Sequence, residues 1–129
     1  MSGWPREKGY SSLSSPALGD INGDGKLEIS IGKSGLNYLL NFDGSLVSGW
    51  PKLSIGKSSY GSLQGDANGD SILDIIVASG GISDCQSLGC GGVYGWKSLD
   101  GTSIFSFPKL IEETKASAVI TDINKDNKV

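Results

Sequence analysis

The sequence has no histidine among its 129 residues, so it lacks the commonest general base of enzymes and the commonest zinc ligand. A serine nucleophile would therefore have no imidazole to activate it. The two cysteines are too few for a structural zinc site, which takes four protein ligands. No apolar run approaches the roughly 18 residues of a membrane-spanning helix, and no basic cluster suggests a nucleic-acid partner. These absences argue against serine hydrolysis, structural zinc, membrane insertion and nucleic-acid binding.

Glycine, by contrast, is abundant. It supplies 20 of the 129 residues, about twice its average usage, and it shows no collagen period. Such a composition indicates many tight turns between short strands. With 37% hydrophobic and 19% charged residues, the chain resembles a globular domain in composition, and its length favours one structural unit.

The stretch from Asp20 to Glu28 places oxygen-bearing side chains at positions 1, 3, 5 and 9 of a tight loop. Ca²⁺ takes about six to eight oxygen ligands, and alternate residues of such a loop can point toward one ion. An EF-hand would need a glutamate at position 12, where this loop has Ile31. Because the residues that follow alternate as in a strand, we predict a calcium loop that leads into a strand. Its expected ligands are Asp20, Asn22, Asp24, the main-chain carbonyl of Lys26, and Glu28.

The same pattern begins at residues 20, 66 and 122, at intervals of 46 and then 56 residues. Two markers keep step with it, an aromatic residue before proline (Trp4-Pro5, Trp50-Pro51, Phe107-Pro108) and an Asp-Gly pair (Asp43-Gly44, Asp100-Gly101). Repeats of this length are typical of propellers and solenoids. The second loop would use Asp66, Asn68, Asp70, the carbonyl of Ile72, and Asp74; the third, incomplete in this chain, would use Asp122, Asn124, Asp126 and the carbonyl of Lys128. Eight of the 14 acidic residues lie in these loops, so the net charge of −3 reflects metal ligation.

Each repeat carries signals for four antiparallel strands. Small residues precede the loop, an apolar strand follows it, a third strand leads to the Asp-Gly turn, and the segment up to the Trp-Pro pair completes the unit. In the first repeat this last segment is Ser45–Trp50. Four-stranded sheets at this spacing are propeller blades. We therefore predict an all-β fold with two full blades, 14–51 and 60–108, the end of a preceding blade at 1–5, and the start of another at 116–129.

The second repeat is longer because of an insertion at 80–92, which contains Cys85 and Cys90. We expect a local disulfide between them, with two free thiols as the alternative. The inserted loop is either a contact surface for a partner or a tolerated surface insertion. A disulfide together with low-affinity calcium loops indicates a location outside the cytosol, in the extracellular space or at the cell surface.

The two complete loops and the strands after them resemble the FG-GAP or VCBS repeats of integrin-alpha-type β-propellers, and Gly3-Trp4-Pro5 and Gly49-Trp50-Pro51 are similar to the bacterial form. In that family the Asp/Asn loop between the first two strands binds Ca²⁺, which the resemblance carries over to the ligands named above. The chain departs from the family at Ser71, which replaces the turn glycine of the second loop, and at Lys125 and Asn127 in the third. Since serine tolerates positive φ poorly, we expect the second loop to bind Ca²⁺ more weakly than the first.

Outside the loops and turns the carboxylates offer no acid–base pair, because Glu112 and Glu113 are adjacent and would face opposite sides of a strand. We therefore expect a non-catalytic, calcium-binding extracellular module for adhesion to, or recognition of, a protein or glycan. Tyr94 and Trp96 would be candidate contacts or, alternatively, core residues between blades. One alternative function is an extracellular subunit that assembles head-to-tail with other copies into rings or filaments. A less favoured one is the scaffold part of a polysaccharide-active enzyme whose catalytic groups lie in missing blades.

Overall fold

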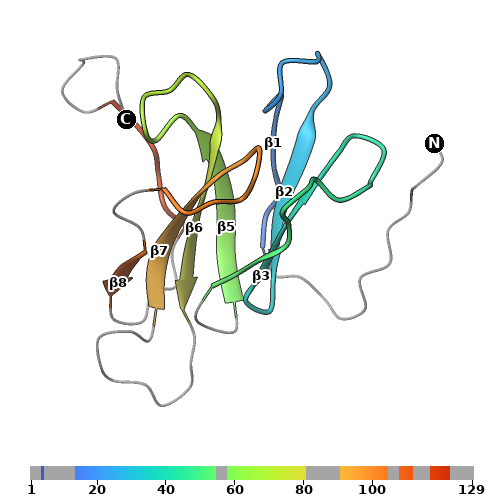
Figure 1. Cartoon of the computed structure of the whole chain (residues 1–129). Coiled ribbons are helices and arrows are strands. Elements are labelled where there is room, and N and C mark those ends of the chain that lie inside the picture. The colour runs from blue at the N-terminus through green and yellow to red at the C-terminus, as the bar shows by residue number, and fades with distance from the viewer. Residues whose placement is uncertain are drawn as a thin grey trace.

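The computed structural model describes residues 4, 14–54, 58–80, 91–104, 108–111 and 117–122. In these residues the fold is all-β without a helix, as expected, and the strands form two antiparallel sheets of four strands each (Figure 1). The first sheet contains β1 (Ala17–Gly19), β2 (Glu28–Lys33), β3 (Leu36–Leu40) and β4 (Lys52–Leu53). The second contains β5 (Ser58–Gly65), β6 (Asp74–Gly80), β7 (Gly91–Lys97) and β8 (Lys109–Ile111). Both sheets keep the strands in sequence order, so each is an up-and-down meander.

A tight turn shows how the sequence produces this order. β2 and β3 stay in register down to the pair Lys33 and Leu36, which leaves Ser34 and Gly35 as the whole connection. Both connecting residues have positive φ, 49° and 82°, which is the geometry of a two-residue type I′ hairpin turn.

The two sheets pack face to face, with β5 lying against β1 and β2 (Figure 1). We call the contact zone between them the seam. The indole of Trp96 stacks on Tyr94 with ring centres 5.5 Å apart and meets Trp50 edge-on at 6.0 Å. Tyr94 and Trp96 are only 7% and 5% exposed, so of their two possible roles the structure shows the core role. The buried apolar residues of the seam are Ile21, Leu39, Trp50, Ile75, Val77, Tyr94 and Trp96.

Buried hydroxyl groups also cross the seam. Ser30 on β2 donates to Ser62 Oγ on β5 at 3.0 Å, and Ser62 donates in turn to the carbonyl oxygen of Ser30 at 2.9 Å. In a second such contact, Ser54 donates to Ser79 Oγ at 3.1 Å. Small side chains at these positions let the strands approach closely while their polar groups remain paired.

The fourth strand of the first sheet does not lie where the sequence pattern predicts it. Ser45–Trp50 contributes only one isolated bridge, between Leu46 and Leu40, and the strand begins after the Trp-Pro pair at Lys52. The chain turns before this pair, where the N–H of Trp50 bonds to Val47 O and Gly49 has a φ of 84°. This turn takes the chain out of the sheet and directs the Trp50 side chain into the seam. The strands of the two sheets span residues 17–53 and 58–111, and the predicted blade bounds, 14–51 and 60–108, stay a prediction.

The predicted start of a third unit is only partly covered by the described residues. Residues 117–122 form no strand, although Ser117 donates to the carbonyl oxygen of Tyr60 on β5 at 2.7 Å. The strand that would follow the third loop and pair with residues 117–122 lies outside the described residues. No helix in the described part of the chain is long and apolar enough to cross a membrane.

Candidate metal centres

Two of the predicted calcium loops are described in full. Loop 1 (residues 20–28) joins β1 to β2, and loop 2 (residues 66–74) joins β5 to β6, so each connects the first two strands of its sheet. Of the third loop, Asp122 is described, whereas Asn124, Asp126 and Lys128 lie outside the described residues. Cys85 and Cys90, the predicted disulfide, also lie outside them.

The two loops share one hydrogen-bond scheme. The carboxylate at position 1 accepts the backbone N–H groups of positions 4, 5 and 6; the side-chain oxygens at positions 3, 5 and 9 accept the N–H groups of positions 5, 7 and 2. In loop 1 the donor–acceptor distances are 2.7, 3.1 and 2.8 Å at Asp20, 2.9 Å at Asn22, 2.8 Å at Asp24 and 3.1 Å at Glu28. In loop 2 they are 2.6, 3.0 and 2.7 Å at Asp66, 2.9 Å at Asn68, 3.0 Å at Asp70 and 3.1 Å at Asp74. The predicted side-chain ligands of both loops are thus all turned toward their own loop.

The described residues contain no group of three His, Cys, Asp or Glu side chains close enough to hold a metal ion. The side-chain oxygens of positions 1, 3 and 5 accept backbone N–H groups instead. At position 1 of loop 2, burial and those bonds act on the pKa in opposite directions. Although burial works to raise it, the N–H groups of Ser71, Gly69 and Asp70 hold the pKa of Asp66 below its usual value. The position-1 carboxylate of loop 2 is therefore ionised at neutral pH.

The carboxylates at position 9 differ from the others because they are buried. Glu28 and Asp74 are each 1% exposed, and Asp74 Oδ1 has no hydrogen-bond partner in the part of the chain that is described. Burial, followed by the negative charges of Asp70 and Asp66, raises the pKa of Asp74 to about 6, against the N–H of Ala67 and the charge of Lys97. Burial is also the main cause of the raised pKa of Glu28. An unpaired buried carboxylate oxygen beside other carboxylates is costly, and a divalent cation would offset that cost. The residues of loop 2 therefore fit Ca²⁺.

Lysines lie beside both loops. In loop 1, Lys26 Nζ is 3.6 Å from Asp24 Oδ2 and 4.4 Å from the centre of the Phe42 ring. In loop 2, the lysine comes from another element: Lys97, at the end of β7, places its Nζ 3.9 Å from Asp70 Oδ2. All four charged side chains are partly exposed, so these pairs contribute little to stability.

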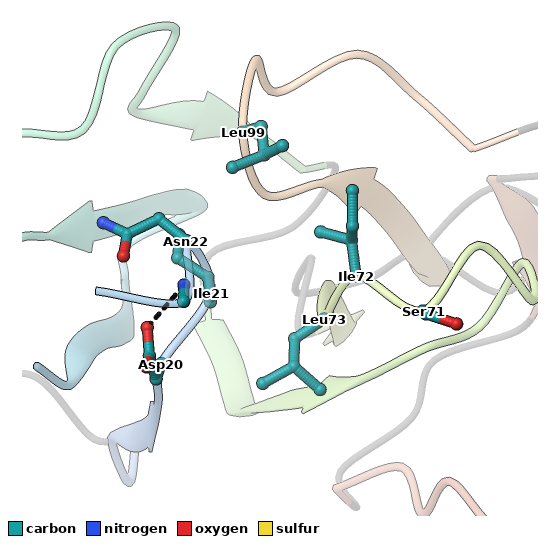
Figure 2. A pocket seen from close by; sticks show the side chains of 8 residues that line it. Asp20, Ile21, Asn22, Ser71, Ile72, Leu73 and Leu99 are labelled. Atoms are coloured by element: carbon teal, nitrogen blue, oxygen red, sulfur yellow. Dashed lines mark hydrogen bonds between the residues drawn. The ribbon is translucent and has the colours of Figure 1, made fainter. Parts of the chain in front are cut away.

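A cleft of about 290 Å³ separates the two loops (Figure 2). Residues of loop 1 form one wall, and residues of loop 2 together with Leu99 form the other. Leu99 comes from the Asp-Gly turn of the second sheet and approaches loop 1 only because the sheets stack, so no local pattern marks it in the sequence. The lining residues are Asp20, Ile21, Asn22, Gly23, Ser71, Ile72, Leu73 and Leu99.

Ser71 is strained as the sequence predicts. Its φ is 67°, where loop 1 has Gly25 at 81°, and a non-glycine residue in this region costs about 1 to 2 kcal/mol. We expect Ser71→Gly to stabilise the protein by about 0.5 to 1 kcal/mol, since part of the relief is lost to the greater entropy of glycine in the unfolded chain. Urea denaturation measures this change.

Ser34→Gly is the matched control, because Ser34 also has a positive φ, 49°, but lies in the β2–β3 turn. It should give a similar gain in stability and leave Ca²⁺ binding unchanged, whereas Ser71→Gly should also tighten binding at loop 2. If Ser71→Gly destabilised the protein, strain at this position would be refuted.

Comparison of the chain with protein-family models, curated proteins and solved structures yields no match. The resemblance to FG-GAP or VCBS repeats therefore stays a prediction.

Proposed function

We propose that this chain is a calcium-binding module of the extracellular space or cell surface, built from propeller-type blades, that serves adhesion or recognition of a protein or glycan. The observation that carries the calcium assignment is the pair of loops with one hydrogen-bond scheme, one of which ends in a buried, unpaired carboxylate oxygen at Asp74. Two unrelated turns would have no reason to share all six backbone-to-side-chain bonds.

The proposed ligands of each ion are the side chains at positions 1, 3, 5 and 9 and the carbonyl at position 7. Ca²⁺ would supply positive charge between carboxylates that otherwise repel one another. The ion would have a structural effect, because position 9 begins β2 or β6 while position 1 follows β1 or β5. Binding would hold the first two strands of each sheet together at the loop end.

Contacts between the sheets support the blade interpretation. Trp50 Nε1 donates to Ser98 O at 3.0 Å, from the first sheet to the turn of the second, and Trp4 Nε1 donates to Phe42 O at 2.9 Å, in the corresponding turn of the first sheet. Trp4 therefore makes the same kind of hydrogen bond to the turn of the first sheet that Trp50 makes to the turn of the second.

A second pair of contacts repeats in the same way. A side chain on Gly19 would collide with Gln64, and one on Gly65 would meet Ile120. Gly19 and Gly65 both directly precede a loop, while Gln64 and Ile120 both lie two residues before the next one. The same contact therefore recurs between successive units, which is the pattern expected for neighbouring blades of a propeller.

Titration calorimetry with Ca²⁺ tests the metal assignment. We expect two sites in the parent chain, one site after Asp24→Ala and one after Asp70→Ala, since each variant removes a ligand from one loop only. Asp100→Asn is the control, because Asp100 is an exposed acidic residue in a turn outside both loops, where it accepts from Thr102. If Asp24→Ala and Asp70→Ala both kept the parent stoichiometry and affinity, the ligand assignment would be wrong.

A second candidate function is self-assembly, which the contacts of Trp4 and of residues 117–120 favour. Residues outside the two sheets contact them on both sides. Trp4 contacts the first sheet, and residues 117–120 contact the second. A subunit that uses these contacts between copies would join head-to-tail, giving rings or open filaments. Sedimentation in millimolar Ca²⁺ distinguishes the two: a monomer supports the recognition module, and larger species that vanish with Trp4→Ala support assembly.

A further inference from the structure

One position, just before the Asp-Gly turn, holds a different residue in each of the two sheets. Asn41 and Lys97 each directly precede the Asp-Gly turn region: their N–H groups bond to Ser45 O and Thr102 O, and their carbonyl oxygens accept from Gly44 and Gly101. Asn41 and Lys97 therefore occupy the same place in the two sheets, but only Lys97 carries a charge.

The side chains of Asn41 and Lys97 make different contacts. Asn41 is occupied within its own turn, where its amide donates to Ser45 Oγ at 2.9 Å. Lys97 instead is the strand partner of Asp74, the position-9 carboxylate, and its Nζ is 3.9 Å from Asp70 Oδ2, at position 5. One ammonium group thus lies beside two of the proposed ligands of loop 2.

Loop 1 has its own lysine, but that lysine has a second place to bind. Lys26 Nζ lies 4.4 Å from the centre of the Phe42 ring, and a cation over an aromatic face is stabilised there. Lys26 can therefore withdraw from Asp24 when an ion arrives. Among the described residues, Lys97 makes no aromatic contact of this kind, and its charge remains beside the loop.

We infer that Lys97 is an affinity-setting residue that weakens cation binding at loop 2 relative to loop 1, by pairing with Asp70 and by repelling a divalent ion next to Asp74. The inference rests on the proposed function, and the loop 2 site has the independent support of the buried, unpaired Asp74 Oδ1. Its consequence is two sites that fill in order, loop 1 at lower Ca²⁺ and loop 2 at higher Ca²⁺. Lys97 touches a ligand and not the ion, so it is a positioning residue.

The test is a reciprocal exchange followed by calorimetry with Ca²⁺ on chains with one loop disabled. With loop 1 disabled by Asp24→Ala, Lys97→Asn should tighten binding at loop 2 about three- to tenfold, the range for one half-exposed charge near a surface ion site. With loop 2 disabled by Asp66→Ala, Asn41→Lys should weaken binding at loop 1 by a similar factor. A merely structural role for Lys97 would not predict opposite effects from the two exchanges.

Two controls separate charge from shape. Lys97→Arg keeps the charge and should leave the affinity near that of the parent, whereas Lys97→Met keeps the length and should match Lys97→Asn. Lys109→Asn changes the net charge equally at an exposed position on β8 and should leave the affinity unchanged.

The outcomes distinguish this inference from the proposed function. Absence of Ca²⁺ binding to the parent chain would overturn the proposed function itself. Binding at both loops, with the same loop 2 affinity for parent and Lys97→Asn, would overturn only the role of Lys97. If Lys97→Asn fails to fold, Lys97→Met and Asn41→Lys decide the question in the same way.

Discussion

We expect Ca²⁺ to raise the melting temperature of this protein by about 15 °C over that of the same protein in EGTA. A ligand at one hundred times its dissociation constant adds about 2.7 kcal/mol per site, and two such sites in a chain of this size give a shift of that order. The physical reason is charge: without an ion, the carboxylates of each loop repel one another, and Glu28 and Asp74 are buried at 1% exposure. Unfolding relieves both penalties, so the metal-free protein melts earlier.

Differential scanning calorimetry in Ca²⁺ and in EGTA measures the shift. Mg²⁺ at the same concentration is the ion control, since it demands a stricter octahedral geometry and gives up its water reluctantly. The double variant Asp24→Ala with Asp70→Ala should lose the shift, and Asp100→Asn should keep it. A protein that melts at one temperature in both buffers would contradict a structural metal.

Replacement of Trp50 by alanine should destabilise the protein by about 3 to 5 kcal/mol, the usual cost of removing a buried tryptophan. Trp50 is 7% exposed, lies edge-on to Trp96, and donates across the seam to Ser98 O. The loss would therefore include packing, a cavity between the sheets and one unpaired buried carbonyl oxygen.

Trp4→Ala is the matched control. Trp4 makes the corresponding hydrogen bond, to Phe42 O, but is 37% exposed, so its removal should cost about 1 kcal/mol or less. The cost of Trp50→Phe should fall between those of Trp50→Ala and Trp4→Ala, because phenylalanine keeps an aromatic ring but lacks the N–H donor. Urea denaturation followed by circular dichroism measures all three, and equal costs for Trp50→Ala and Trp4→Ala would show that the seam is not the core.

The loops are the part that sequence reasoning described best. Spacing alone placed Asp20 and Asp66 at position 1, because the short-range geometry of a turn depends on residues that are neighbours in the chain. The strain at Ser71 followed from the same local argument, and its φ of 67° confirms it. Calcium itself stays a prediction, since a pattern of oxygens specifies a possible ligand set and not its occupant.

The sequence by itself determined the all-β class, the loop geometry and the Asp-Gly turns, because each depends on strand alternation or on residues a few positions apart. Only the tertiary structure decided the rest. It placed the fourth strand at Lys52 and not before Trp50, because the side chain of Trp50 is drawn into the seam. It buried Tyr94 and Trp96 against the first sheet and brought Leu99 up to loop 1. These features depend on how one sheet stacks on the next, and stacking joins residues about 50 positions apart, beyond the reach of any local pattern.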